Sequence, residues 1–412
     1  MRMKKIRPLS VIALVAAVSI VFGVVALMEG KNEGRDIVIP KIGYINRYEI
    51  PENEAMQFMK DMGIGWNLGN TFDAHNDGWG KNREMDMETT WCGVKTTEEM
   101  IKAVHAAGFN TLRLPVSWHN HVDMLFTISP EWLDRVQEVV DYAINDGMYV
   151  ILNTHHDVYD KYYYPDSKNY ATSHRYMTRI WEQLSERFRD YDNHLIFESM
   201  NEPRLKDTGY EWSFNASAPE CLDAADCINK LNQAFVDVVR ASGGNNADRY
   251  LMVPAYCASP ENALSDYFVL PEDGADNKII VSVHAYTPYP FALQDGGTDT
   301  FELTSVSQTS EINRFMSALY KKFVVNGIPV VIGEYGARAK GDNLQSRVNF
   351  AAYYCVNASA RNIPCVWWDN NAFRGNGELF GIFNRAKCEF AYPEIVEALT
   401  LYGGYENVPE KK

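Results

Sequence analysis

Short apolar runs alternate with longer amphipathic stretches along the chain, and this alternation predicts parallel strands joined by helices. After a first helix over residues 52–62, the pattern occurs eight times. We expect the strands to end at residues 66–67, 112–114, 153–155, 200–202, 254–255, 283–286, 333–334 and 367–368. The most periodic helices are expected at 97–106, 130–145, 172–189, 227–241, 310–326 and 343–360, with a weak one at 261–267 and a closing one at 393–401. The predicted fold class is α/β, a (β/α)8 TIM barrel.

The predicted connections differ in length according to their direction. Helix-to-strand connections are short turns such as Asp146-Gly147 and Asn326-Gly327. Strand-to-helix connections are long, over residues 70–96, 157–171, 203–226, 287–309 and 369–393. Long loops in a compact domain are usually functional, and in a barrel these loops all leave from one face. The loop lengths therefore predict an extended binding surface above the C-terminal ends of the strands.

Charge and composition narrow the classes of partner. The 412 residues carry a formal charge of −15, which argues against nucleic acid or an anionic surface and suits a neutral substrate. Aromatic residues make up 13% of the chain. Their flat faces stack on sugar rings, although protein cores use the same residues.

The first 30 residues predict a targeting segment. Arg2, Lys4, Lys5 and Arg7 precede a charge-free, mostly apolar run over residues 9–28. A secretory apolar region is usually about 7–15 residues long and a spanning helix needs roughly 20, so a cleaved signal peptide and an uncleaved membrane anchor both stay open. Either one places the remainder outside the cytoplasm, secreted or tethered. We expect a linker at 31–50, one barrel domain at 51–405, a tail at 406–412, and a monomer.

The seven cysteines show no metal-type C-x-x-C spacing. Cys221 and Cys227 fall in one predicted loop, where they either form a small disulfide, as the export signal would allow, or stay reduced. Cys257, Cys355 and Cys365 lie in apolar stretches and are expected in the core.

Polar side chains occupy the ends of seven of the eight predicted strands. A single polar residue at such a position is often structural, but a whole set on one face of a barrel indicates chemistry. The set comprises Asn67, Arg113, His155, His156, Asn201, Glu202, His284, Tyr286, Glu334 and Trp368.

Two carboxylates with His, Asn and aromatic neighbours are what glycoside hydrolysis needs. One carboxyl has to stay protonated near neutral pH, and the other has to be ionised to attack the anomeric carbon. Arg113 would hold one carboxylate anionic, and His284 and Tyr286 would set the protonation of the pair. Glu198 is a rival acid, but it precedes the strand end, so we expect it to be a buried structural partner of Arg113.

Other chemistries find less support. His155-His156-Asp157 invites a metal interpretation, but adjacent residues at a strand end diverge, and no further ligand completes a set. No glycine-rich phosphate loop opens a helix, and no G-x-S-x-G elbow is present. We therefore predict no metal and no cofactor.

Seven segments resemble the motifs of glycoside hydrolase family 5, the former cellulase family A. They are GWNLGNTFD at 65–73, TLRLPVSW at 111–118, LNTHH at 152–156, FESMNEP at 197–203, VHAY at 283–286, IGEYG at 332–336 and VWWD at 366–369. The first and last of these resemble the branch that acts on cellulose, mixed-linkage glucan and xyloglucan. The resemblance implies a retaining mechanism with Glu202 as acid/base and Glu334 as nucleophile.

The resemblance also assigns substrate contacts. Arg113, His155, Asn201, His284, Tyr286 and Trp368 match the remaining family positions, and Asn201 would bind the 2-hydroxyl of the attacked sugar. Asn67, His156, His75 and His119 are weaker substrate-contact hypotheses.

Three functional hypotheses follow. The first is a retaining endo-β-1,4-glucanase acting on a β-linked glucan. The second is a non-catalytic carbohydrate-binding barrel, which would bind glucan without releasing reducing ends. The third is the same chemistry on β-mannan or xylan. The presence of both carboxylates and their supporting residues favours an enzyme.

Overall fold

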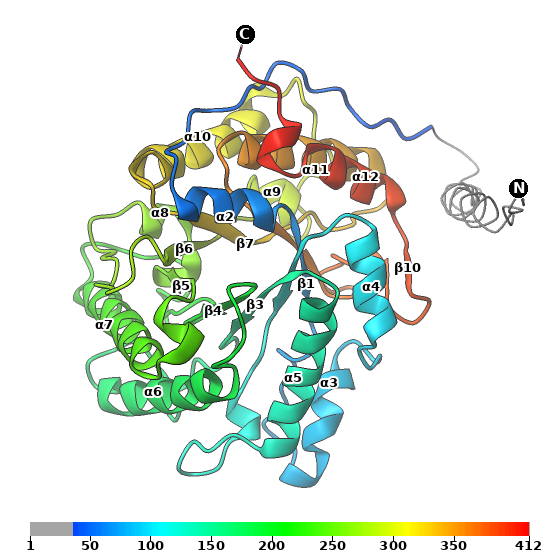
Figure 1. The fold of residues 1–412 in the computed structure, drawn as a ribbon. Coiled ribbons are helices and arrows are strands. Elements are labelled where there is room, and N and C mark those ends of the chain that lie inside the picture. Colours follow the sequence, from blue (N-terminus) through cyan, green and yellow to red (C-terminus); the bar gives the residue numbers. More distant parts are fainter. Residues whose placement is uncertain (1–35, 412) are drawn as a thin grey trace, which may run out of the picture. The chain divides into compact units, whose positions relative to one another are not determined.

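Eight parallel strands close into a barrel in the computed structural model, which describes residues 36–411 (Figure 1). They are β1 (Gly65–Leu68), β2 (Thr111–Leu114), β3 (Tyr149–Asn153), β4 (Leu195–Glu198), β5 (Leu251–Pro254), β6 (Ile279–His284), β7 (Val330–Tyr335) and β8 (Cys365–Asp369). Each strand pairs with the next, and β8 pairs with β1. The predicted (β/α)8 barrel is confirmed.

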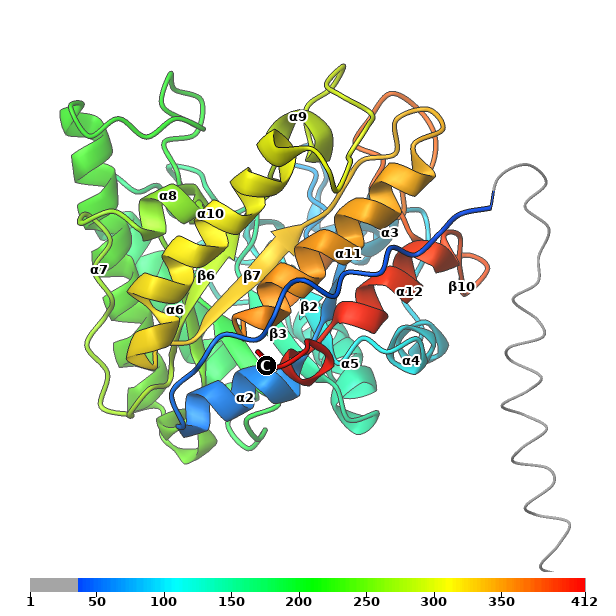
Figure 2. The same ribbon diagram turned by 90° about the horizontal axis from the view of Figure 1, so that it is seen from above.

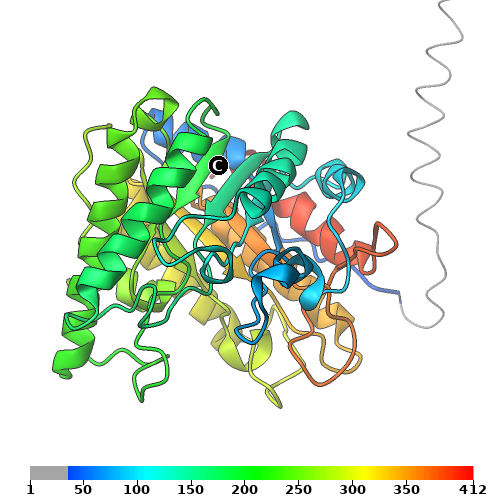
Figure 3. The ribbon, with the colours of Figure 1, turned by 90° about the horizontal axis from the view of Figure 1, so that it is seen from below.

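Helices surround the barrel between successive strands (Figures 2 and 3). The main ones are α4 (Glu98–Ala106), α5 (Pro130–Asn145), α6 (Tyr170–Arg187), α7 (Pro219–Ala241), α8 (Pro260–Ala263), α10 (Val306–Lys322), α11 (Leu344–Ala360) and α12 (Pro393–Tyr402). Short helices α3 (Met87–Thr90) and α9 (Tyr289–Ala292) lie in the strand-to-helix loops, and a hairpin of β9 (Phe383–Asn384) and β10 (Glu389–Phe390) lies in the last loop. That hairpin was not expected from the sequence.

Helix α7 begins eight residues earlier than predicted, at Pro219, a residue whose fixed φ suits a first helical turn. Cys221 and Cys227 therefore lie on this helix and not in a loop, and both are free thiols. Six residues of α-helix separate two positions by about 9 Å along the axis, beyond the reach of a disulfide. The possible bridge between them is excluded by the helix.

Helix α2 (Glu54–Met62) covers the N-terminal end of the barrel. Its N-cap, Asn53, accepts a hydrogen bond from the backbone N–H of Met56, whose carbonyl accepts one from Asn362, just before β8. The ring of Phe58 stacks on Tyr250, just before β5, at a centroid distance of 3.8 Å. This end is thus closed by packing, and the opposite end carries the long loops.

The chain divides into two units, residues 1–38 and 39–412. The predicted targeting segment lies outside the described residues. Among residues 36–411, no helix has the length and apolar character required to cross a bilayer.

An N-terminal strap, residues 39–50, belongs to the barrel unit. Backbone N–H groups of Ile42, Arg47 and Tyr48 donate 2.8 Å hydrogen bonds to the Tyr402 hydroxyl and to the carbonyl oxygens of Pro409 and Ala360 respectively. Figure 2 shows the strap in dark blue across α10, α11 and α12. The barrel unit therefore begins before the predicted boundary at residue 51.

Two irregularities interrupt the regular register of the strands. Between β6 and β7 the pairing shifts at Val283/His284, so that His284 lies opposite Glu334. Between β7 and β8 it shifts again, between Ile332 and Tyr335. Irregularities of this kind re-aim side chains near active sites. Here both lie beside Glu334.

Candidate active site

Glu202 and Glu334 come together at the C-terminal end of the barrel. Glu334 lies within β7, whereas β4 ends at Glu198, so Glu202 lies beyond its strand and not at its end as predicted. Nδ1 of His284 lies 2.9 Å from Oε1 of Glu202 and 3.7 Å from Oε2 of Glu334. One oxygen of each carboxylate lies within 4.8 Å of the other. The two carboxyl groups are close enough to act on the same atom.

A fully buried Arg113 connects the acids of the site. Its Nη1 donates to Oε1 of Glu334 at 2.7 Å, its Nε to Glu198 at 2.9 Å and its Nη2 to Oδ1 of Asn201 at 2.7 Å. Burial opposes the charge of Arg113, but the carboxylates of Glu198 and Glu334 raise its pKa above the ordinary value. The family motif predicted that Arg113 contacts substrate, but its side chain has no exposed surface, so this prediction was wrong. Arg113 positions the groups that do.

Asn67 is likewise not a substrate contact, because it is completely buried. Its Nδ2 donates to the carbonyl oxygens of Gly333, Val366 and Trp367 at 2.9–3.3 Å, and its Oδ1 accepts from Nη1 of Arg113 at 3.0 Å. Asn67 therefore ties β1 to β7 and β8 beneath the site and holds the guanidinium in place.

Glu198 is a buried structural acid, as predicted. Besides Arg113, it accepts hydrogen bonds from Ser282 Oγ at 2.7 Å and from Asn153 Nδ2 at 3.0 Å. Three donors compensate this buried carboxylate for the water that it has lost.

His284 and Glu202 are hydrogen-bonded and shift each other's pKa. Burial disfavours the charged imidazolium of His284, but the charge of Glu334 and the hydrogen bond with Glu202 raise its pKa above the usual value. Burial also disfavours the Glu202 carboxylate, yet the hydrogen bond and charge of His284 bring the pKa of Glu202 below the usual value. We expected one carboxyl to stay protonated, whereas the pKa of Glu202 is lowered and that of His284 is raised, which favours the opposite distribution of the proton.

Tyr286 holds the other carboxylate. Burial and the charges of Glu334 and Glu202 raise the pKa of Tyr286 well above the usual value, so the phenol keeps its proton. Its hydroxyl donates to Oε2 of Glu334 at 3.0 Å. With Arg113 on Oε1, both oxygens of Glu334 are oriented by donors.

His155 and Trp368 form an aromatic wall beside the carboxylates. Burial, together with His156 and Arg113, lowers the pKa of His155 well below the usual value. Nδ1 of this neutral ring accepts from Asn153 Nδ2 at 3.1 Å, which leaves its proton on Nε2, 4.0 Å from Oε1 of Glu334. The Trp368 ring lies parallel to His155, with an interplanar angle of 4° and centroids 5.9 Å apart.

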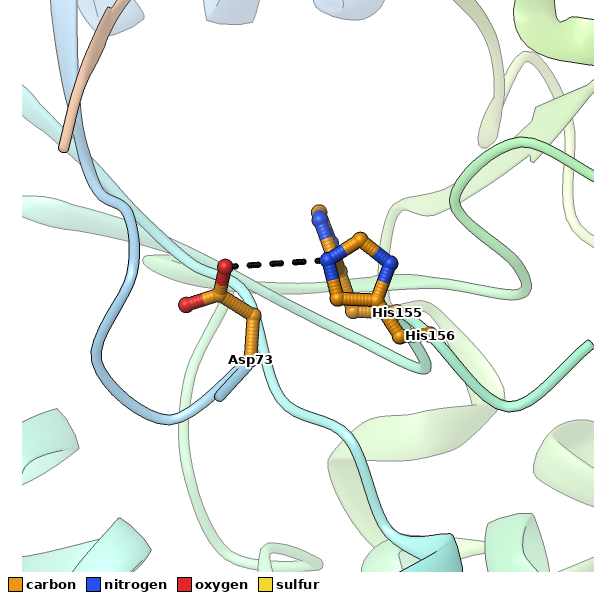
Figure 4. Close-up of side chains that lie close together, drawn as sticks. All are labelled: Asp73, His155 and His156. Atoms are coloured by element: carbon orange, nitrogen blue, oxygen red, sulfur yellow. Dashed lines mark ion pairs between the residues drawn. The ribbon is translucent and has the colours of Figure 1, made fainter. Parts of the chain in front are cut away.

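His156 lies beside Asp73, an acid that was not predicted to belong to the site. Figure 4 shows Asp73 facing His156 with His155 alongside, and Nε2 of His156 lies 3.9 Å from Oδ2 of Asp73. Burial raises the pKa of Asp73 to about 7, against the lowering effect of backbone N–H groups at Thr71 and Asn70. The expectation that no third ligand joins His155 and His156 was therefore wrong.

Asp157, the acid adjacent in sequence, turns away from these two histidines. Its Oδ1 accepts from the backbone N–H groups of Trp118 and His119 at 2.9 and 3.0 Å, and it lies 2.8 Å from Nδ1 of His119. The predicted divergence at this strand end holds for Asp157.

Glu378 is a further acid that sequence reasoning missed. It lies in the loop after β8, where no pattern distinguishes it. Burial raises its pKa, with Arg338 opposing and the charges of Glu334 and Glu202 adding to the rise. A third carboxyl group is thus close enough to interact electrostatically with both acids of the site.

Exposed aromatic side chains stand on the loops around the site. Trp91, Trp212 and Tyr289 are 41%, 64% and 55% exposed. The guanidinium of Arg204 lies 4.1 Å from the ring centre of Trp212 and so holds that ring in place. These loops surround the carboxylates with flat apolar faces of the kind that stack on sugars.

Comparisons with known proteins agree with this geometry. Residues 73–374 match the family model "Cellulase (glycosyl hydrolase family 5)". Endoglucanase B of Ruminococcus albus is 44% identical over 351 residues, 84% of this chain and 80% of its own length. A GH5 family lichenase from Caldicellulosiruptor sp. F32 is 55% identical, with a TM-score of 0.88 over 89% of this chain and 100% of its own. A GH5-4 broad specificity endoglucanase from Ruminococcus champanellensis, solved with bound cellotriose, is 41% identical, with a TM-score of 0.78 over 86% of this chain and 100% of its own.

Proposed function

This chain belongs to the cellulase family, glycosyl hydrolase family 5, and from that premise we propose that Glu334 is the nucleophile and Glu202 the acid and base of a retaining β-glucanase. The chain is a glycoside hydrolase of the endoglucanase type. The observation that carries the two roles is the approach of the carboxylates to within 4.8 Å. Retaining enzymes keep their carboxyls about 5–5.5 Å apart, whereas inverting enzymes separate them by roughly 6.5–9.5 Å to admit a water.

In the first step, Oε of Glu334 attacks the anomeric carbon and forms a covalent glycosyl–enzyme ester. The hydrogen bonds from Arg113 and Tyr286 orient this carboxylate before substrate arrives. The bond between the anomeric carbon and the leaving oxygen breaks as Glu202 supplies a proton to that oxygen. Glu202 thereby becomes a carboxylate.

The proton for this step comes from the His284–Glu202 pair. In the resting site Nδ1–H of His284 donates to Oε1 of Glu202 at 2.9 Å. A sugar that covers the partly exposed Glu202 removes its remaining solvent, and desolvation favours the neutral carboxylic acid. Transfer of the proton from His284 along the existing hydrogen bond then protonates Glu202, which can act as the acid.

In the second step the Glu202 carboxylate takes a proton from a water molecule, whose oxygen attacks the anomeric carbon. The ester to Glu334 breaks, and the product keeps the configuration of the substrate because two inversions have occurred. Asn201, whose amide oxygen is fixed by Arg113, would present its amide N–H groups to the 2-hydroxyl of the attacked sugar. His155 and Trp368 would flank the same ring.

The polymer that we propose is a β-glucan with internal β-1,4-glucosidic bonds, either mixed-linkage glucan or cellulose. The 55% identity to a lichenase supports the first. A variant of that lichenase has been solved in complex with cellotetraose, and the similar endoglucanase binds cellotriose. Both ligands are chains of glucose.

The test is a side-by-side measurement of reducing-end release from barley glucan, carboxymethylcellulose, xyloglucan, xylan and mannan. We expect the highest initial rate on barley glucan and a β-anomer as the first product seen by proton NMR. Faster hydrolysis of mannan or xylan would overturn the polymer assignment. An α-anomer as the first product would overturn the retaining mechanism. Binding of glucan without release of reducing ends would show a non-catalytic carbohydrate-binding barrel.

The location of the protein is a separate part of the proposal. The basic residues before position 8 and the apolar run at 9–28 support export, either as a secreted protein or tethered through the uncleaved segment. Mass spectrometry of the N-terminus, after separation of membrane from culture medium, distinguishes these outcomes. An intact chain in the cytoplasm would contradict both.

A further inference from the structure

His75, Asp77 and His119 bring three metal-ligating side chains together on the loops that follow β1 and β2. Nε2 of His119 and Nδ1 of His75 lie 3.3 and 3.7 Å from the same oxygen, Oδ1 of Asp77. One ligating atom from each residue lies within 4.8 Å of the others. The Asp77 side chain is 59% exposed and that of His119 is 1% exposed, so the group is anchored on one side and open to solvent on the other.

The spacing of these atoms matches the coordination shell of a small divalent ion. Ligand atoms about 2.0–2.2 Å from Zn²⁺ at tetrahedral angles lie roughly 3.3–3.6 Å from one another. Of the two separations from Asp77 Oδ1, 3.3 Å falls in this range and 3.7 Å lies 0.1 Å above it. Two imidazoles and a carboxylate are also a ligand set that ions such as Zn²⁺ prefer.

The surroundings of the two histidines suit a role as metal ligands. Nδ1 of His119 lies 2.8 Å from the buried carboxylate of Asp157, so the other ring nitrogen, Nε2, is turned toward Oδ1 of Asp77 at 3.3 Å. Carboxylates orient metal-binding imidazoles in this way. Nδ1 of His75 has no hydrogen-bond partner within the part of the chain that the structure describes. A metal ion at this point would replace the hydrogen bond between Nε2 of His119 and Oδ1 of Asp77.

Two other clusters in residues 36–411 bring together ligating atoms, but their atoms are already engaged. Both oxygens of Asp73, which faces His155 and His156, accept backbone N–H groups at 2.7 and 3.1 Å. In the third cluster His284 is hydrogen-bonded to Glu202, in the pair that the hydrolytic reaction uses. In the His75 group, Nδ1 of His75 has no hydrogen-bond partner among residues 36–411, and the contact of His119 Nε2 with Asp77 Oδ1 is between two of the ligands themselves.

We propose that His75, Asp77 and His119 bind a divalent transition-metal ion of the Zn²⁺ type, with a water or a hydroxyl group in the open fourth position. The ion ties the loop after β1 to the loop after β2 and does not enter the hydrolytic reaction. The His75 ring lies 5.7 Å from the ring of His156, so the bound ion fixes one side of the surface that surrounds the carboxylates. The site stands independently of the roles assigned to Glu202 and Glu334.

The experiment is isothermal titration of the chelator-treated full chain with Zn²⁺, accompanied by the visible spectrum of the Co²⁺ complex. Asp77→Asn and His75→Gln each remove one ligand at a position that is at least partly exposed, so the fold is retained. His105→Gln is the matched control. His105 lies on α4, outside the proposed metal site, and its Nδ1 is 2.7 Å from Oδ2 of Asp146. We expect one Zn²⁺ per chain in the wild type and the control, and at least tenfold weaker binding in both ligand variants.

Several results would overturn the site. One is a wild type that binds no Zn²⁺. Another is a Zn²⁺ affinity within tenfold of the wild type in either ligand variant, or an equal loss in the control. A Co²⁺ spectrum dominated by sulfur-to-metal charge transfer would place the ion on cysteine thiols. Loss of binding in Glu202→Gln, with the Asp77 and His75 variants unaffected, would place it between the catalytic carboxylates.

Discussion

Nη1 of Arg113 lies 2.7 Å from Oε1 of Glu334, so the proposed nucleophile is paired with a buried cation in the resting site. The same guanidinium lies 2.8 Å from Glu198, which is also buried. One cation therefore compensates two anions in the interior of the barrel. Arg113 is consequently important for stability as well as for activity.

Replacement of Arg113 by Met should destabilise the protein by about 3–5 kcal/mol, because it leaves buried carboxylates without their partner. Urea unfolding followed by circular dichroism measures this change. Arg187→Met is the control, since Arg187 pairs with Asp134 at the surface and such pairs contribute up to about 1 kcal/mol. Equal losses in the two variants would contradict the role of Arg113.

Glu202→Gln and Glu334→Gln should fail on different substrates. On barley glucan, Glu202→Gln should lose about 10²–10⁴ in rate because the leaving oxygen receives no proton. A dinitrophenyl cellobioside has a leaving group that needs no proton, so this variant should still release a burst of dinitrophenolate. Glu334→Gln should lose turnover on both substrates while its circular dichroism spectrum stays that of the wild type. A burst from Glu334→Gln would exchange the two assignments.

The His284–Glu202 pair should stabilise the fold within a limited pH window. The lowered pKa of Glu202 contributes stability above the usual carboxyl value of about 4.3, which is lost as pH falls through the folded pKa. The raised pKa of His284 contributes stability below the usual value of about 6.5, which is lost as pH rises through the folded pKa. Both contributions are complete only between these values.

His284→Phe removes the pair while keeping a ring in the same place. The difference in urea midpoint between the wild type and this variant should be largest at about pH 5–6 and should shrink toward either side. Midpoints measured at closely spaced pH values check this. A difference that does not change with pH would show that His284 acts through packing alone.

Tyr286→Phe should slow turnover by about tenfold to a hundredfold, because a hydrogen bond to a charged group is worth about 1.5–3 kcal/mol. The lost bond is the 3.0 Å contact with Oε2 of Glu334. Tyr250→Phe is the matched control, since the hydroxyl of Tyr250 has no hydrogen-bond partner among residues 36–411. kcat for barley glucan should fall in the first variant alone.

Gly69→Ala should displace the Trp368 ring. A methyl group at position 69 would lie 2.7 Å from Cη2 of Trp368 and 2.9 Å from the carbonyl oxygen of Asp369, closer than van der Waals contact allows. We expect a higher KM for cello-oligosaccharides, since this ring flanks the bound sugar. In the control, Gly43→Ala, the added methyl meets nothing within 4 Å. An unchanged KM in Gly69→Ala would exclude Trp368 as a sugar contact.

The barrel could be predicted from the sequence, because short strands rich in apolar residues alternate with amphipathic helices eight times. Helix α5 begins and ends where predicted, at Pro130 and Asn145. The prediction misplaced the end of β4, because it extended the strand past Glu198 and Ser199 to Glu202, whereas the backbone pairing stops at Glu198. It also placed the start of α7 too late, because the polar residues around Cys221 do not show the helical period clearly.

The acids of the site could be predicted from the sequence, but the burial of their neighbouring side chains could not. Asn67 and Arg113 were predicted to contact substrate, yet both are completely buried and act on other side chains. A motif gives the identity of a residue and not its exposure. The approach of Asp73 to His156, and that of Asp77 to His119, depends on loop conformations that no periodic pattern encodes.

The strap formed by residues 39–50 has a practical consequence. Arg47 on the strap donates to Pro409 and pairs with Glu406 and Glu410, so the C-terminal end of the barrel unit is held against the strap, beside α2. That side is the one sealed by packing, and the catalytic rim faces the other way. An immobilised or fused form of the enzyme, coupled through the C-terminal end of the barrel unit, would leave the rim free to engage a bulky polymer.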